Sequence, residues 1–289
     1  MNQFKTHVEW GDFDLAKQQH CYLNNLFELL NTANTKQQSV ADQLDLLAHK
    51  NGFNAAKLPQ FVNQSELNNE TRYYEQIIAE LHQVPSRESS WHDFFNGIIW
   101  LQFPATKKLL NRLHVEQIQA FGLHPRTLVR NQVTHFDECG LVLVGTDPKA
   151  REIVNALKNH QWSQALMEEK GGWGSILHPI IFGHANLEML LNPFMGLTAK
   201  WLYIECPQLE IEPIPSLENL ALIDLALALH IEQNQAFASK GQLKPLPLMG
   251  IPGWYKNQNA EFYQQTSFFR PLNNNGKTLL MSPISPQLK

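Results

Sequence analysis

The chain has 289 residues, of which 43% are hydrophobic, a formal net charge of −4 and a sequence pI near 6.3. It is long enough to bury a sizeable core as one large domain or two small ones. Its overall acidity argues against a protein that binds nucleic acid non-specifically through its whole surface.

The charge is distributed unevenly along the chain. Between Pro104 and His135 there is one acidic residue, Glu116, against five basic ones, so this segment carries +4 and the remainder −8. The five basic residues are Lys107, Lys108, Arg112, Arg126 and Arg130. A basic zone on an acidic body favours a small anionic ligand over a nucleic-acid partner. A solvated helix face would explain the same pattern.

The cysteine content and the hydropathy favour a cytoplasmic protein. Cys21, Cys139 and Cys206 lie far apart without a C-x-x-C pair, as expected in a reducing compartment. The N-terminus lacks the charged start and apolar run of a signal peptide. The longest apolar stretch, 220–229, is interrupted by Asp224 and is too short to cross a bilayer, so we expect no membrane partner.

The first 84 residues read as helices joined by polar connections, with no pattern that indicates chemistry. Apolar residues recur at helical spacing within 14–30, 40–47 and 73–81. We therefore divide the chain into a helical N-terminal segment, 1–84, and a main domain, 85–289, within one compact unit.

The next helix starts at Ser90, because Ser90-x-x-Asp93 is a capping box. Nearly every side of this helix is apolar. His92, Asp93 and Asn96 share one sector of it, since successive residues are about 100° apart. Polar groups in such a helix are buried and need partners, so His92 and Asn96 are either ligand-contacting or bonded within the core.

Pro104 suits the first position of the following helix, where its missing N–H is not needed. Lys107, Asn111 and His114 then form one stripe at positions i, i+4 and i+7. Such a stripe can bind a phosphate or carboxylate, or it can be the solvated side of the helix.

Residues 129–136 and 141–144 have strand character, and the four residues between them fit a type I turn. We expect a hairpin here. The adjacent carboxylates Asp137 and Glu138 are then turn residues. Alternatively, they bind a divalent cation or act as acid and base.

His184 and Glu188 are one helical turn apart and could share a metal ion, or form an ordinary helix contact. Residues 217–231 are apolar nearly all round and predict a core helix, in which Asp224 needs a structural partner. From Lys244 onward, prolines and glycines predict irregular structure. This loop is either a lid over a site or a strap over the core.

Several short blocks along 85–271 resemble a bacterial family known as the domain of unknown function 3025. The blocks are W-H-D-F-F-N at 91–96, F-P-x-x-K at 103–107, Asn111, Arg130, Thr134, F-D-E-x-G at 136–140, F-G-H-x-x-x-E at 182–188, P-L-x-G-I-P-G-W at 247–254, Tyr263 and F-R-P at 269–271. In that family an Asp commonly follows the Arg, where this chain has Asn131. The resemblance implies a family and a site location, but no activity, cofactor or substrate.

These observations predict an α+β fold, mainly helical with a small antiparallel or mixed sheet. The leading hypothesis is an enzyme that acts on a small anionic substrate by hydrolysis or group transfer, with a divalent metal as a candidate cofactor. We assign catalysis to His92, Asp137 and Glu138, substrate binding to Asn96, Lys107, Asn111, Arg130 and Trp254, and metal binding to His184 and Glu188. The alternative is a non-catalytic module that binds a nucleic acid or protein through the basic 104–135 segment. In a third interpretation, the polar residues bind no ligand and only attach loops to the core.

Overall fold

The computed structural model describes residue 10 and residues 20–32, 38–207, 209–210 and 215–272. The α-helices in these ranges are α1 (Cys21–Leu29), α2 (Val40–Lys50), α3 (Tyr74–Leu81), α4 (Trp91–Gln102), α5 (Pro104–Phe121), α6 (Leu128–Cys139), α7 (Ala150–Lys158), α8 (His184–Met189), α9 (Leu217–Gln233) and α10 (Ala260–Tyr263). Short 3₁₀ turns are η2 (Ala55–Lys57), η3 (Gln64–Leu67), η5 (Lys170–Gly172) and η6 (Leu248–Gly250), and η4 (Gln164–Glu168) is a π-helical turn. The prediction of a mainly helical α+β fold is confirmed.

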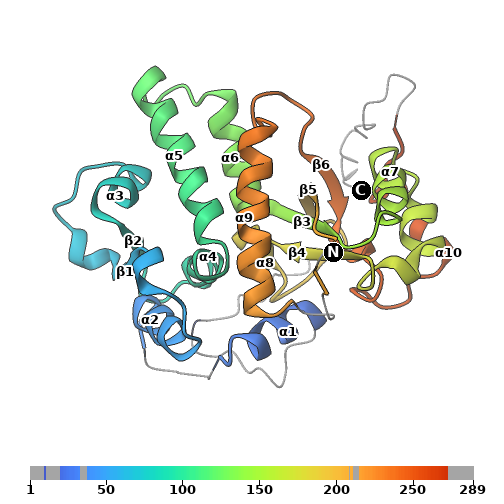
Figure 1. The fold of residues 1–289 in the computed structure, drawn as a ribbon, viewed down its shortest axis with the longest axis horizontal. Helices are drawn as coiled ribbons and strands as arrows, with labels where there is room; N and C mark the ends of the chain where they lie inside the picture. Colours follow the sequence, from blue (N-terminus) through green and yellow to red (C-terminus); the bar gives the residue numbers. More distant parts are fainter. Residues whose placement is uncertain (1–9, 11–19, 33–37, 208, 211–214, 273–289) are drawn as a thin grey trace, which may run out of the picture.

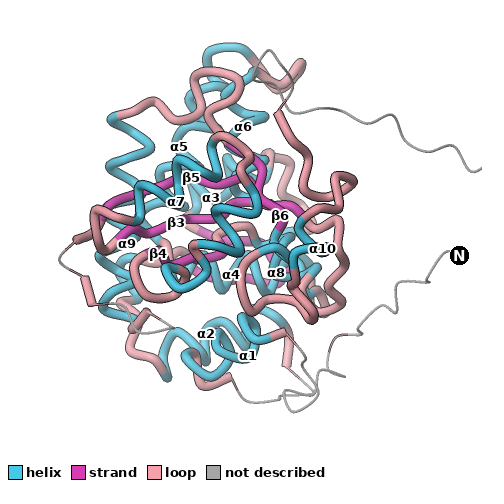
Figure 2. Tube along the Cα trace, turned by 90° about the vertical axis from the view of Figure 1, so that its right-hand side faces the viewer, coloured by secondary structure: helices cyan, strands magenta, loops and turns pink. Residues whose placement is uncertain are grey.

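Six strands in the described part of the chain form two sheets. They are β1 (Gln60–Asn63), β2 (Gln83–Ser86), β3 (Gly140–Gly145), β4 (Leu177–Ile181), β5 (Thr198–Glu205) and β6 (Lys244–Pro247). β1 and β2 pair in parallel, whereas the larger sheet has the order β4-β3-β5-β6 and is mixed. Figure 2 shows the four strands of the larger sheet crossing the middle of the molecule between helices. β3 is buried along its whole length, as expected for a central strand.

Three long helices, α5, α6 and α9, run side by side next to the sheet (Figure 1). One continuous cluster of buried apolar side chains extends from α1 and α2 to the sheet and the segment around Phe269. The β1–β2 pair crosses the boundary proposed at residue 84, so the N-terminal helices and the main domain share one core.

The starts of α4 and α5 follow from local chemistry. Oγ of Ser90 accepts a hydrogen bond from the backbone N–H of Asp93, which confirms the cap. At the start of α5, the carboxylate of Asp224 on α9 accepts the backbone N–H groups of Ala105 at 2.7 Å and Thr106 at 2.8 Å. Asp224 is only 2% exposed, and its partner is therefore a helix end.

The hairpin predicted around 137–140 is wrong. Residues 128–139 form helix α6, which Thr127 caps, and Gly140 begins the central strand β3. Val129, Val133 and Phe136 are spaced by four and three residues, which is the helical period and not the alternation of a strand. Asp137 and Glu138 consequently lie in the last turn of a helix, not in a β-turn.

The segment after Lys244 is more regular than its proline content predicts. Lys244–Pro247 forms the edge strand β6, where a proline is tolerated because one side of the strand has no partner. Leu248, Met249 and Ile251 are at most 1% exposed. The loop is thus a strap that covers the core, and the lid interpretation is not supported.

Candidate functional site

The central feature of the molecule is a chain of polar side chains where α4 packs against α8. His92 and Asn96 lie one turn apart on α4, and His184 and Glu188 lie one turn apart on α8. Nδ1 of His92 is 3.0 Å from Oε2 of Glu188, and Nε2 of His92 is 3.1 Å from Nε2 of His184. His92 is therefore contacted at both ring nitrogens by the α8 pair.

Asp137 extends this chain to α5 and α3. Its Oδ2 lies 3.8 Å from Nδ1 of His184, and its Oδ1 accepts a hydrogen bond from Nζ of Lys107 at 2.5 Å. The same Nζ donates to Oδ1 of Asn96 at 2.8 Å, and the amide of Asn96 donates to the hydroxyl of Tyr74 at 2.9 Å. The side chains from Glu188 to Tyr74 form one connected series, which we call the polar relay: Glu188, His92, His184, Asp137, Lys107, Asn96 and Tyr74.

Two glycines allow α6 and α8 to approach closely enough for this contact. A Cβ at Gly183 would lie 2.4 Å from the backbone N of Gly140 and 2.5 Å from the carbonyl oxygen of Glu138. The N–H of Gly183 donates instead to the carbonyl of Gly140 at 2.8 Å. The backbone at the end of α6 therefore contacts the backbone at the start of α8, and this contact places Asp137 beside His184.

The polar relay runs from the interior to the surface. The side chains of His184 and Lys107 are 7% and 6% exposed, whereas those of His92 and Glu188 are 36% and 40% exposed. A molecule arriving from solvent would thus meet His92 and Glu188 first, with the buried groups behind them.

The outer pair favours its charged forms. The hydrogen bond that His92 donates to Glu188 raises the pKa of His92 above 6.5, and the same bond lowers the pKa of Glu188. Both shifts have the cause expected for an ion pair. His92 is therefore an imidazolium over part of the neutral pH range, with a carboxylate that orients it.

The buried groups of the polar relay, His184 and Asp137, differ in protonation from the outer pair. Burial lowers the pKa of His184 to about 4, so its ring is neutral near pH 7. Burial also acts to raise the pKa of Asp137, but the charge of Lys107 and the neighbouring His184 outweigh it and leave that pKa below its usual value. Asp137 is consequently a carboxylate paired with a buried ammonium.

These protonation states assign the tautomers. A protonated His92 donates one N–H to Glu188 and the other to Nε2 of His184. A neutral His184 then carries its proton on Nδ1, on the side of Asp137. The arrangement is a path along which one proton can move between two imidazoles, with a carboxylate at each end.

A second buried cluster adjoins Asp137 on the side of α3. Nδ1 of His114 lies 4.0 Å from Oε1 of Glu75, and Asn111 donates to the carbonyl oxygen of Glu75 at 2.8 Å. Burial lowers the pKa of His114 to about 4 and raises that of Glu75, so both favour neutral forms. Among the described residues, Oε2 of Glu75 and Nδ1 of His114 are buried without a hydrogen-bond partner, as is Nδ1 of His184.

The residues predicted for substrate binding fall into different environments. Lys107 and Asn96 belong to the polar relay, where the ammonium of Lys107 is neutralised by Asp137 instead of facing solvent. Arg130 is only 1% exposed and donates to the carbonyl of Leu123 at 2.7 Å, so its guanidinium does not reach the surface. Trp254 lines a separate cavity beside α1.

Of the residues predicted for catalysis and metal binding, four lie together in the polar relay and Glu138 lies outside it. Asp137 and His92 belong to the polar relay together with His184 and Glu188, whereas Glu138 is exposed in the last turn of α6. Glu188 bonds to His92, and Asp137 bonds to Lys107. Within the described ranges, no group of three or more His, Cys, Asp or Glu side chains is arranged to hold a metal ion.

Sequence reasoning missed Tyr74 and Glu75, which α3 contributes from a segment without any pattern that indicates chemistry. The apolar positions of this helix, Ile77 and Ile78, gave its period but no sign that its first turn faces α4 and α6. Only the three-dimensional packing of α3 on α5 reveals the connection.

This fold and site define a mainly helical α+β protein whose helices converge on a partly exposed relay of acids and bases. Residues 59–273 match the family described as Protein of unknown function (DUF3025), and the chain belongs to that family. The match begins earlier than the blocks at 85–271 indicated, and includes α3. Comparison with curated proteins and with solved structures finds no match.

The structure bears on two further expectations from the sequence. No helix in the described ranges is long and apolar enough to cross a membrane. Cys21, Cys139 and Cys206 are all free thiols.

Proposed function

We propose that this protein is an enzyme that acts on a small anionic substrate by hydrolysis or group transfer, with His92 as its acid–base group. The observation that carries the proposal is the position of His92 between Glu188 and His184, half-exposed at the surface. A general acid or base needs a pKa near the working pH and a partner that fixes its orientation. The raised pKa of His92 and its bond to Glu188 meet both conditions.

The buried part of the relay supports this role. In the proposed cycle His92 donates its proton to a leaving group or takes one from a nucleophile. His184 then exchanges a proton with His92, and Asp137 stabilises the charge that His184 acquires in that exchange. Lys107, Asn96 and Tyr74 hold Asp137 in place and are positioning residues.

The preference for an anionic substrate rests on the imidazolium of His92 and on Arg87 close by. The Arg87 side chain is 60% exposed and is held by two contacts of 2.8 Å to Asp93. A carboxylate or phosphate oxygen could contact both cations from solvent. The substrate is expected to be small, because the acid–base groups belong to short facing helices instead of an extended surface.

The charge pattern supports the enzyme over the nucleic-acid module. Of the basic residues in 104–135, Lys107 and Arg130 are buried, and Arg112 lies 2.5 Å from Glu232 and 3.1 Å from Glu116. Binding to a nucleic-acid backbone needs several exposed cations on one face. Segment 104–135 therefore has fewer exposed cations than its sequence indicates.

A divalent metal remains a prediction from the sequence, with His184 and Glu188 as its proposed ligands. It is tested by metal analysis of untagged protein, and by thermal melts of wild type and His184→Ala with added Zn, Mn, Mg or Ca. A metal bound by His184 raises the wild-type melting temperature and not that of the variant.

The enzyme proposal is tested by screening chromogenic phosphate monoesters, phosphate diesters and carboxylic esters that carry a negative charge. We expect turnover by wild type, and a loss of at least about 100-fold in His92→Ala, the scale of general acid–base catalysis. His135→Ala is the matched control, since His135 is exposed on α6 and outside the relay. Equal activity in His92→Ala and wild type would overturn the assignment of His92. No turnover, together with salt-sensitive binding to unrelated DNA or RNA, would favour the binding module.

A further inference from the structure

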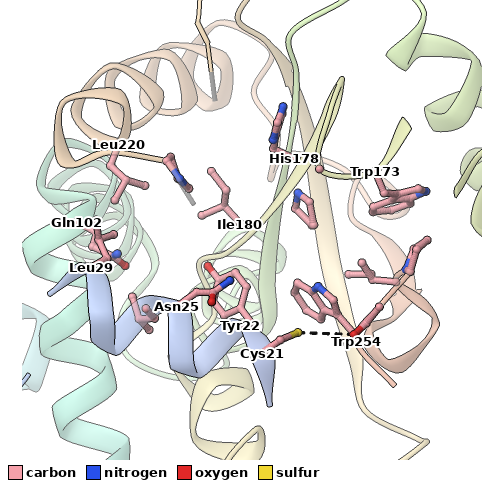
Figure 3. A pocket seen from close by; sticks show the side chains of 17 residues that line it. Cys21, Tyr22, Asn25, Leu29, Gln102, Trp173, His178, Ile180, Leu220 and Trp254 are labelled. Atoms are coloured by element: carbon pink, nitrogen blue, oxygen red, sulfur yellow. Dashed lines mark hydrogen bonds between the residues drawn. The ribbon is translucent and has the colours of Figure 1, made fainter. Parts of the chain in front are cut away.

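A cavity of about 220 Å³ lies between α1, strand β4 and the loop 251–254. Figure 3 shows its walls, with Tyr22 and Trp254 close together on one side and Trp173 and Leu220 farther out. None of the seven residues of the polar relay lines it. It is therefore a separate feature that the proposed function does not use.

Its walls are mainly aromatic and aliphatic. The rings of Tyr22 and Trp254 have centroids 5.1 Å apart, and Ile180 and Leu220 are at most 3% exposed. The hydroxyl of Tyr22 accepts a hydrogen bond from the backbone N–H of Ile181 at 2.9 Å, so this polar atom is already satisfied by the protein. An apolar cavity of about 150 Å³ is large enough for benzene, so this cavity of about 220 Å³ has room for a molecule of that size.

One polar side chain in the wall lacks a partner. His178 is only 3% exposed, and its Nε2 is buried without a hydrogen bond among the described residues. Burial lowers the pKa of His178, so its ring is neutral. With the single ring proton on Nδ1, Nε2 is an acceptor, and this is the tautomer that an O–H or N–H group of a ligand can bond to. A buried acceptor without a donor is costly, so it points to a missing partner.

We propose that this cavity is a binding site for a small aromatic molecule that carries one O–H or N–H donor, which bonds to Nε2 of His178. The apolar walls take the ring, and the unpaired Nε2 of His178 selects molecules with a donor over those without one. Selection of this kind follows because the site would otherwise keep an unpaired polar atom.

Phenol and benzene are matched probes, because they have the same ring and differ in the hydroxyl. Isothermal titration calorimetry on the full chain should show phenol binding at one site. In His178→Phe, phenol binding should weaken about tenfold relative to benzene binding, the scale of one buried hydrogen bond. Retained benzene binding shows that the variant keeps its cavity. Equal weakening of both probes, or none, would overturn the role of His178.

A second pair of variants tests the location even if His178→Phe does not fold. Leu29 is half-buried on α1 and lines the cavity, so Leu29→Trp fills it. Leu46→Trp is the matched control, because Leu46 is 46% exposed on α2 and does not line the cavity. The account requires that Leu29→Trp abolishes phenol binding and that Leu46→Trp retains it. Unchanged binding in Leu29→Trp, or no phenol binding by wild type, would contradict the proposal.

Discussion

Nε2 of His184 lies 3.1 Å from Nε2 of His92, and the two rings stand at 79° with their centroids 4.5 Å apart. One of these nitrogens must carry a proton and the other must accept it, since two lone pairs at this distance repel. Because burial keeps His184 neutral and Glu188 favours the charged form of His92, the proton belongs to His92.

Replacing Lys107 should destabilise the fold strongly. The ammonium of Lys107 is the charged partner of Asp137, and Lys107→Met leaves that carboxylate unpaired in a largely buried position. We expect the free energy of unfolding to fall by about 3 kcal/mol, measured by urea denaturation near pH 7. Lys107→Met with Asp137→Asn should recover most of this loss, since both charges are then gone. The exposed Lys108→Met is the control, and a similar loss there would contradict the account.

Gly183→Ala should separate α6 from α8. Its Cβ would lie within 2.6 Å of backbone atoms in 138–140, and backbone cannot move aside as a flexible side chain can. A loss of about 2 kcal/mol in unfolding free energy is expected from such overpacking. Gly171→Ala is the matched control, because nothing lies within 4 Å of a Cβ there. Equal stability of the two variants would show that the close approach is not required.

Asp224→Ala tests the cap that α9 provides for α5. The variant removes a carboxylate that accepts one part-buried and one buried backbone N–H group, at 2.7 and 2.8 Å. The expected loss is about 2 kcal/mol in chemical denaturation, since both donors are left unpaired. Asp45→Ala on the exposed side of α2 should change stability by less than about 0.5 kcal/mol. If Asp224→Ala is equally mild, α5 does not depend on this contact.

His184 should contribute to acid denaturation. Its folded pKa of about 4 lies below the ordinary value of 6.5, so the unfolded chain binds more protons between these values. Stability therefore falls as the pH drops from about 6.5 toward 4. In His184→Asn this part of the pH dependence, about 3 kcal/mol at most, should disappear from denaturation curves measured at several pH values. His49→Asn, on the surface of α2, should keep the wild-type profile.

How much of the site could be predicted depends on the kind of element involved. The pairs His92/Asn96 and His184/Glu188 were recognisable because polar residues one turn apart share a helix face, whatever the rest of the fold does. Asp137 was placed in a turn, because the β-branched residues of 129–134 imitate a strand. The spacing of Val129, Val133 and Phe136 indicates a helix, whereas the β-branched composition of the segment favours a strand.

Other features could not be read from local sequence. Tyr74 and Glu75 join the site through the packing of α3 on α5, and Asp224 finds its partner about 120 positions away in the chain. The separation of Trp254 from His92 likewise depends on the path that β6 and the segment after it take across the core. Such contacts are set by tertiary packing, which leaves no period or motif in the sequence.

The His92–Glu188 pair has a defined pH window. The raised pKa of His92 adds stability that is fully present below its unfolded value of about 6.5 and is lost as the pH rises through the folded pKa. The lowered pKa of Glu188 adds stability that is present above about pH 4.5 and is lost as the pH falls through the folded value. Because both side chains are more than one-third exposed, the pair contributes only about 0.5 kcal/mol.

The central claim is that His92 is a protonated acid–base group between Glu188 and a neutral His184. The most direct measurement is an NMR pH titration of the histidine ring nitrogens in wild type and Glu188→Gln, with Glu138→Gln as control. The account predicts that His92 titrates above pH 6.5 in wild type and shifts downward in Glu188→Gln alone, while His184 stays neutral to below pH 5. A His92 that titrates at or below 6.5 and ignores Glu188→Gln, or a His184 that is protonated at pH 7, would contradict it.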